Sequence, residues 1–444
     1  MLLISVVALC VAVLPAMAVA RIYGLWSLAN ISMLIFLFGF SLRAVVLAVN
    51  PQFAFARLPL SGEELTQATI VGTIALLMMS APMLLGARWA TREAAVPYKS
   101  GVLSPFALTS AGVLIFALQA FILHRAFGGW GAALSQLSQR SIIGGLGYAT
   151  NLDLLAVPLI ITAWIESGRR RKRGLQFFCT AILLAALPWL AIVKGRGMVL
   201  IVLLTGAVAY YRICQLRPRL IITIVGAVTA IGSIVVGLAW RVSAQSGRPF
   251  VENLGRVSRN ALEVTSSTAP LVDHYAAGIQ YARLVGHDYG ASLLTALTVL
   301  VPRALWADKP RYLPQLLGEA LYRNPTSGMP AGLLGEGHLA FGLFGPWVFA
   351  LVFGAIILLM ERIIRRPQRA LLKTWLLYVM VSFVLGTLRT GPQAGLMLVQ
   401  VSALIGLPLF VAEYSAAILL RRLHDRARGA RAGWSAAAGG HAEL

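Results

Sequence analysis

The sequence predicts an all-α protein, a polytopic transmembrane helix bundle of about 11 spans with a large helical external loop. The first observation is composition: 58% of the 444 residues are hydrophobic, 12% are charged, and the mean hydropathy is +0.78. Soluble domains carry about 25% charged residues. The second observation is that apolar runs of about 20 residues recur along nearly the whole chain. The third is that most of the 38 Lys and Arg residues stand in short segments between those runs.

The apolar runs give the expected spans, which lie at 2–20, 25–48, 66–87, 102–123, 152–166, 175–193, 198–211, 220–239, 338–360, 371–388 and 393–413. Residues 1–20 could instead be a cleavable signal, because the sequence AMA at 16–18 resembles a cleavage site. No basic residue precedes the run, so a span is favoured. Residues 175–211 would form a helix of about 55 Å, which is too long for one crossing, so the chain must fold back near KGRG at 194–197.

Basic segments set the expected orientation of the chain. They lie at 88–99, 169–173, 212–219, 361–373 and 421–431, and all fall on one side of the membrane if the spans are right. Because Lys and Arg favour the cytoplasmic side, we expect the N-terminus outside and the C-terminus inside. The same bias explains the net charge of +22 without nucleic acid as a partner.

Two outer connections, 124–151 and 240–337, are too long to be simple turns. The second is too apolar to be a disordered tail. We expect it to form short helices on the outer rim of the bundle, with 290–301 in the membrane interface. The chain then divides into an N-terminal membrane bundle at 1–239, a large external loop at 240–337, three C-terminal spans at 338–420 and a basic tail at 421–444.

Several cations stand at the outer level, where the positive-inside rule does not explain them. They are Lys194 and Arg196 in KGRG, Arg389 in TLRTGPQ, Arg241 in LAWRVSA and Arg43 inside the second span. A single cation at such a place is most often an anchor at the membrane surface or the partner of a buried carboxylate. Several at one depth indicate an anion site, because guanidinium groups pair with phosphate or carboxylate.

The sequence GLLGEGHLAFGLFG at 332–345 places Glu336 and His338 at the same outer level. His338, Gly342 and Gly345 are spaced i, i+4 and i+7, so we expect them to share one helix face that points into the bundle. A carboxylate or imidazole beside arginines has the parts for proton transfer next to a phosphorylated leaving group. The alternative is that Glu336 only forms an ion pair with one of the arginines.

Motifs for other chemistries are weak. Glu63 and Glu64 in SGEELTQ indicate first-turn acids of a helix after a Ser cap rather than a metal pair. The tetrad GASL at 290–293 resembles a motif of intramembrane serine proteases, but it is expected by chance in a chain with 42 glycines. No HExxH, Walker loop or dinucleotide fingerprint is present, and the three cysteines have no CxxC spacing. We therefore expect neither a metal nor a cofactor.

The order of these features resembles the Wzy-type O-antigen and capsule repeat-unit polymerases, over roughly residues 175–400. That family commonly carries a proline, Arg, Trp, Lys-Pro sequence in its long loop, followed by a G-E... F-G-x-x-G run. Here these residues are Pro302, Arg303, Trp306, Lys309, Pro310, Gly335, Glu336, Phe341, Gly342 and Gly345. The paired Arg-x10-Gly loop motifs of some members are absent, and His338 stands where many members have another residue.

The resemblance implies a metal-independent glycosyltransferase of the GT-C type in the bacterial inner membrane. Its substrate would be an undecaprenyl-diphosphate-linked oligosaccharide at the periplasmic face, and a chain-length regulator would be a possible partner. Glu336 or His338 would be the catalytic base; Lys194, Arg196, Arg241 and Arg389 would bind diphosphate; Arg303, Trp306 and Lys309 would contact glycan or diphosphate. The alternatives are an O-antigen ligase and, in another class, a transporter or flippase of an anionic lipid-linked substrate.

Overall fold

The computed structural model describes residues 1–51, 61–88, 103–130, 150–214, 220–259, 270–298, 301, 305–306, 308, 310–323, 329–366, 369–406, 411, 415 and 418. Their regular structure is helical, and eight helices are long and apolar enough to cross a membrane. The all-α, polytopic fold class is therefore confirmed, and the bundle contacts lipid. The expected count of about 11 spans stays a prediction.

The eight membrane helices are α1 (Leu2–Tyr23), the continuous α2–η1–α3 (Leu28–Phe36, Leu37–Leu42, Arg43–Val49), α4 (Gly62–Leu85), α6 (Pro105–Phe127), α10 (Arg173–Val193), α11 (Arg196–Cys214), α18 with η3 and α19 (Gly332–Phe341, Gly342–Phe344, Gly345–Arg365), and α20 (Ala370–Arg389). The other three expected spans coincide with α9 (Asp153–Arg169), α12 (Leu220–Ser246) and the apolar helix Pro392–Gly406. The α9 helix has only 17 residues, which would reach about 26 Å.

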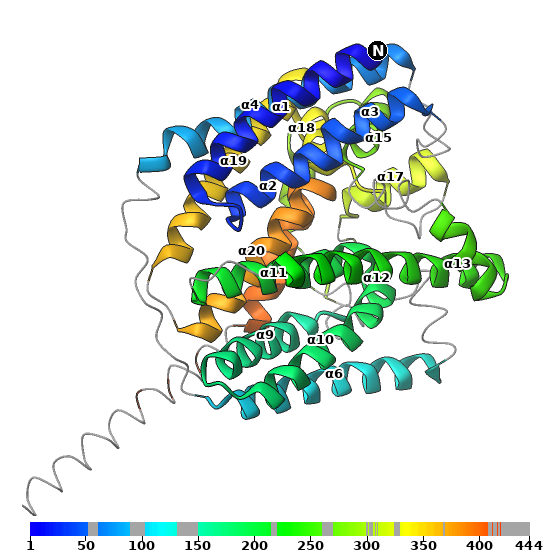
Figure 1. The fold of residues 1–444 in the computed structure, drawn as a ribbon. Helices are drawn as coiled ribbons and strands as arrows, with labels where there is room; N and C mark the ends of the chain where they lie inside the picture. Colours follow the sequence, from blue (N-terminus) through cyan, green and yellow to red (C-terminus); the bar gives the residue numbers. More distant parts are fainter. Residues whose placement is uncertain are drawn as a thin grey trace, which may run out of the picture.

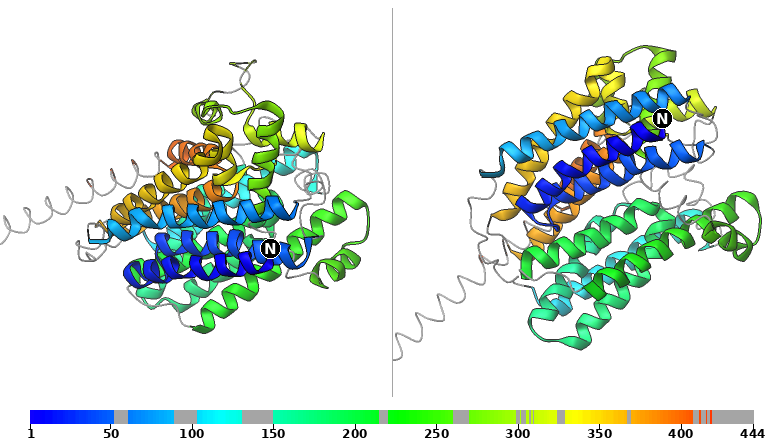
Figure 2. Two further views of the ribbon diagram at one scale, coloured as in Figure 1. Left: turned by 90° about the horizontal axis from the view of Figure 1, so that it is seen from above. Right: turned by 45° about the horizontal axis from the view of Figure 1, so that its top comes forward.

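Helix α20 lies at the centre of the bundle, and 83% of its apolar stretch is buried. On one side of it lie α1, α2–α3, α4, α18 and α19, and on the other lie α6 and α9 to α12, as Figures 1 and 2 show. A helix that is apolar all round must find protein or lipid on every face. The neighbours of α20 are mostly other helices of the protein.

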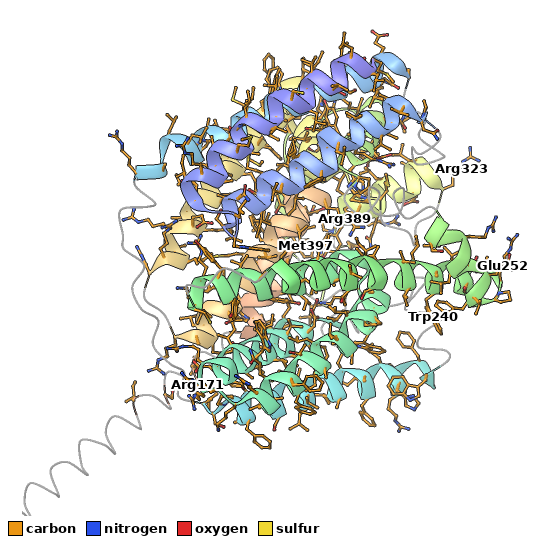
Figure 3. All side chains as sticks on the ribbon, viewed as in Figure 1. Arg171, Trp240, Glu252, Arg323, Arg389 and Met397 are labelled. Carbon is orange, nitrogen blue, oxygen red and sulfur yellow. The ribbon has the colours of Figure 1, made fainter. Side chains whose placement is uncertain are left out.

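The helices alternate in direction, which gives the bundle two distinct ends. One is the basic end, where α9, α11 and α19 finish in Arg169, Arg212 and Arg365. The other is the long-loop end, which holds α13 (Phe250–Arg259), α15 (Leu271–Val285), α16 (Ala291–Leu297) and α17 (Leu313–Tyr322). Figure 3 shows Arg171 at the basic end and Glu252 and Arg323 at the long-loop end. Which end faces the cytoplasm stays a prediction.

Two local predictions are confirmed. Ser61 caps α4: its side chain accepts a hydrogen bond from the Glu64 N–H, and the Glu64 carboxylate accepts one from the Ser61 N–H. The chain also folds back at KGRG, because α10 ends at Val193 and α11 begins at Arg196. Gly195 between them has φ +101°, a conformation that a residue with a Cβ rarely adopts.

The expectation that the long loop lies on the outer rim is wrong for α15. Residues Leu271–Ile279 are all buried, and the helix packs against α18, α4 and η1. Close approach of two glycines explains this placement. A Cβ added to Gly278 would lie 2.5 Å from the Gly335 Cα, so only glycine allows α15 and α18 to pack at this distance.

The expectation of one continuous helix face at His338, Gly342 and Gly345 is also wrong. Helix α18 ends at Phe341, because Gly342 adopts φ +61° and ψ −143° and breaks the helix. The chain turns through η3 and restarts as α19 at Gly345. Gly345 does allow a close backbone approach, as expected, but its neighbour is Gly337 of α18 rather than another helix of the bundle.

Candidate functional site

Glu336 is the buried carboxylate at the long-loop end, and its side chain is 1% exposed. Its Oε2 atom accepts a hydrogen bond from the backbone N–H of Gln393 at 3.0 Å. Its Oε1 atom is buried and has no hydrogen-bond partner among the described residues. The carboxylate lies directly against Gly391, where any Cβ would overlap with it.

The turn after α20 explains why Glu336 finds a donor there. The chain reverses at Gly391, which has φ +122°, and the next helix begins at Pro392. The first N–H groups of a helix have no partner inside it and carry partial positive charge. Gln393 offers such an N–H, so Glu336 caps the helix Pro392–Gly406 from α18 with one oxygen, and the other has no hydrogen-bond partner among the described residues.

The Gln393 side chain connects this carboxylate to the long loop. Its Oε1 accepts a hydrogen bond from the Leu313 N–H at 3.0 Å, and its Nε2 is hydrogen-bonded to the Thr295 hydroxyl. Gln393 is 1% exposed. It therefore fixes the positions of α16 and α17 relative to Glu336.

Arg389 and the KGRG turn lie side by side. A Cβ added to Gly197 would lie 3.0 Å from the Arg389 Nη1 atom, so the guanidinium lies against the first turn of α11. Figure 3 places Arg389 between the two groups of helices. For Arg196 and Arg241 the structure describes the backbone alone: Arg196 begins α11 beside Gly197, and Arg241 lies in the last turns of α12.

Arg43 is the partner of a buried carboxylate, one of the two roles considered for a single cation. Its Nε atom lies 3.0 Å from Asp273 Oδ2, and its Nη2 lies 3.4 Å from Asp273 Oδ1. Both side chains are at most 2% exposed. The π-helix η1 ends directly before Arg43 and turns it toward α15, and such π-helical turns occur frequently at functional sites.

His274, the next residue of α15, reaches the end of α20. Its ring has a hydrogen bond to the Arg389 backbone. The pKa of His274 is lowered to about 3, mainly by burial and also by the charges of Arg389 and Arg43, while that hydrogen bond opposes the shift. The imidazole is therefore neutral at neutral pH and adds no positive charge beside Arg389.

Lys194 is already neutralised inside the protein. Its Nζ atom lies 2.5 Å from Asp153 Oδ1 and donates to Asn151 Oδ1 at 2.7 Å. The Tyr378 hydroxyl donates to the other Asp153 oxygen at 2.8 Å. Because Asp153 is fully buried and balances the lysine, we leave Lys194 out of the anion site proposed below.

His338 faces different neighbours from Glu336. The two lie two positions apart on α18, which places them on different faces of the helix. The His338 ring lies 5.9 Å from the Tyr275 ring and 5.9 Å from the His287 ring, and its Nδ1 atom has no partner among the described residues. The structure thus brings Glu336, but not His338, against the turn that follows Arg389.

The remaining expected site residues lie on the long loop. Arg303 and Lys309 are outside the described residues, and Trp306 is 42% exposed. No group of three His, Cys, Asp or Glu side chains gathers as a metal site would require, within the part of the chain that the structure describes. The absence of a cofactor from the reaction stays a prediction.

Asp273, His274, Gly391 and Gln393 are the site residues that the sequence analysis did not identify. A signal for the first two exists: Asp and His stand together in LVDHYAAG, a stretch that is otherwise small or apolar. Polar pairs in such stretches usually face a partner inside the protein. Gln393 has no such signal, because TGPQ is ordinary turn composition.

Comparison of the chain with protein families, with curated proteins and with solved structures found no match. The function is therefore argued from the geometry at the long-loop end. Three facts support it: Glu336 Oε1 has no hydrogen-bond partner in the described part of the chain, the chain reverses at Gly391, and Arg389 lies against Gly197.

Proposed function

We propose that this protein is a membrane polysaccharide polymerase of the bacterial inner membrane, with its site at the long-loop end on the periplasmic side. It would transfer a glycan from undecaprenyl diphosphate to a lipid-linked repeat unit without a metal. One observation carries the proposal: Glu336 Oε1, which has no hydrogen-bond partner among the residues that the structure describes, lies against Gly391, two residues from the arginine beside the KGRG turn. A candidate base, Glu336, and a candidate diphosphate-binding residue, Arg389, thus lie at the same turn.

The proposed reaction is a displacement at the anomeric carbon of the donor glycan. The acceptor hydroxyl oxygen forms the new bond to this carbon, and the bond from the carbon to the diphosphate oxygen breaks. Glu336 Oε1 takes the hydroxyl proton. Undecaprenyl diphosphate leaves with the bonding electrons, and Arg389 and Arg196 stabilise the negative charge that develops on it.

The surroundings of Glu336 suit this role. Its Oε2 is held by the Gln393 N–H, which fixes the orientation of the carboxylate, while Oε1 has no hydrogen-bond partner among the described residues. His274 is neutral and buried beside the Arg389 backbone, so it positions the end of α20 without adding charge. Trp306, which is exposed on the long loop, would contact glycan.

The test uses the purified protein with lipid-linked repeat units in detergent, and the products are separated by length. Wild-type protein should lengthen the glycan. Glu336→Gln should abolish lengthening, because the amide oxygen still accepts the Gln393 N–H bond but no longer acts as a base. Glu252→Gln is the matched control, since Glu252 is an exposed carboxylate at the same end, and it should retain full activity. Full activity of Glu336→Gln would overturn this assignment.

The same assay separates the alternatives. Transfer to lipid A core without lengthening of the glycan would identify a ligase. Movement of the lipid-linked substrate across vesicles without any transfer would identify a transporter or flippase. Either result would replace the proposed polymerase, and a change in product length on adding a candidate chain-length regulator would identify that partner.

A further inference from the structure

Lys373 is a buried lysine at the basic end, far from the proposed catalytic site. It lies in the first turn of α20, and its side chain is 4% exposed. The 16 residues from Lys373 to Arg389 span about 24 Å of helix, so the two positions are well separated. Burial of a lone ammonium group is strongly unfavourable unless an opposite charge accompanies it.

In the described part of the chain, the charged group that acts on Lys373 is another cation. Among the described residues, Arg212 at the end of α11 is its one charged neighbour, and no hydrogen bond or ion pair joins Lys373 to a carboxylate. Like charges at close range disfavour the charged form of both groups. The described residues therefore offer no carboxylate that compensates the charge of Lys373.

Glu361, the buried carboxylate beside Arg212, is already occupied. Its Oε2 lies 2.5 Å from Arg212 Nη2, and its Oε1 accepts the Ala29 N–H at 3.2 Å. Glu361 is fully buried, so both of its oxygens are committed to protein donors. Arg212 has its counter-charge here, and no oxygen of Glu361 is left to pair with Lys373.

Arg365 adds a third cation to this cluster. It lies in the last turn of α19, is half-buried and interacts electrostatically with Arg212, Glu361 and Tyr23. Its Nε atom is buried and has no hydrogen-bond partner among the described residues. Among the described residues, Glu361 is the carboxylate that acts on this cluster of Arg212, Arg365 and Lys373, so positive charge is in excess between the ends of α11, α19 and α20.

We propose that Arg212, Arg365 and Lys373 form a binding site for a phosphate group at the basic end of the bundle. A phosphate offers several acceptor oxygens, which suits one ammonium and two guanidinium groups from three helices. Basic pockets between membrane helices bind the head groups of anionic lipids, so a phospholipid and a soluble phosphate are the two sources of this ligand.

The test measures lipid retention and thermal unfolding of the full-length protein in neutral detergent. Phosphatidylglycerol and phosphatidylcholine are added in separate arms, and inorganic phosphate is added in a third. Phosphatidylglycerol should remain bound in native mass spectrometry and raise the unfolding midpoint, and phosphatidylcholine should not. Lys373→Gln should weaken phosphatidylglycerol binding at least about tenfold, because one charge-assisted contact is lost. If only inorganic phosphate gives the Lys373-dependent shift, the ligand is a soluble phosphate.

Lys172→Gln is the matched control, because Lys172 is exposed at the same end and its loss lowers the net charge equally. It should leave lipid binding unchanged. Lys373→Met provides a second readout: without added lipid it should raise the unfolding midpoint, since an uncompensated charge is removed, and it should abolish the lipid-induced shift. Wild-type lipid binding by Lys373→Gln, or a lower lipid-free midpoint of Lys373→Met, would overturn the proposal.

Discussion

The carboxylate of Glu336 accepts the backbone N–H of Gln393 at 3.0 Å, across 57 residues of sequence. This bond joins α18, which follows the long loop, to the first turn of the helix after α20. It engages one carboxylate oxygen and leaves the other buried without a partner among the described residues. The stability and the proposed chemistry of the long-loop end therefore depend on the same side chain.

Gly391→Ala should displace Glu336. A methyl group at this position overlaps with the carboxylate, and φ +122° is itself unfavourable for alanine. We expect the variant to lose about 1–3 kcal/mol of unfolding free energy and to lose polymerisation. Thermal unfolding and the product-length assay are the measurements.

Gly386→Ala is the control for this substitution. Gly386 is five residues earlier, inside α20, and an added Cβ would have no atom within 4 Å. It should be neutral or stabilising by up to about 1 kcal/mol, as expected for glycine in a helix interior. Equal effects of the two substitutions would show that the contact between Gly391 and Glu336 is unimportant.

Gln393→Ala should remove the side-chain hydrogen bonds that hold α16 and α17 of the long loop. The hydrogen bond from residue 393 to Glu336 should remain, because its donor is the backbone N–H. The lost bonds are those to Leu313 and Thr295. Hydrogen exchange in α16 and α17 should become faster, by about tenfold per 1.4 kcal/mol lost. Gln400→Ala, which removes a side-chain amide whose Oε1 has no described partner, should leave this exchange unchanged.

Asp273→Ala should be strongly destabilising, since it leaves the Arg43 guanidinium buried without its carboxylate. We expect a loss of about 3–5 kcal/mol in thermal or denaturant unfolding. The double variant Arg43→Met with Asp273→Leu should lose less unfolding free energy than the two single variants lose when their losses are added. Glu252→Ala is the control, because Glu252 and its partner Arg248 are both about half exposed. This variant should lose only about 0–1 kcal/mol of unfolding free energy.

His274 should make the protein less stable as the pH falls. Its folded-state pKa of about 3 lies below the ordinary value of 6.5, so below pH 6.5 the unfolded chain takes up a proton that the folded protein does not. Stability should fall by about 1.4 kcal/mol per pH unit from this residue, between pH 6.5 and about 3.

The measurement is the difference between wild type and His274→Gln in unfolding free energy at several pH values. By pH 5 the wild type should have lost about 2 kcal/mol relative to the variant, compared with their difference at pH 7.5. His287→Gln, at an exposed histidine, is the control and should show no such change. Parallel pH profiles of wild type and His274→Gln would contradict the assignment.

Features set by neighbouring residues could be predicted from the sequence, and those set by distant residues could not. The Ser61 cap and the reversal at KGRG depend on four or five consecutive residues. The proximity of Arg389 to KGRG also follows from the positions of span ends. Arg43 and Asp273 are 230 residues apart in the sequence. Their pairing was not predicted, because α15, which carries Asp273, was expected on the outer rim of the bundle. The end of helix α18 was not predicted, because the conformation of a single residue, Gly342, decides it.

The π-helical turn at Leu37–Leu42 has a consequence for how the second span tolerates changes in length. A π-turn contains one residue more than an α-helical turn, so the segments before and after it are out of phase by about 100° of rotation. Removing a single residue here would restore an ordinary helix and swing the guanidinium of Arg43 away from α15. This stretch should therefore accept substitutions more readily than deletions, and a one-residue deletion should act like the loss of a buried charge pair.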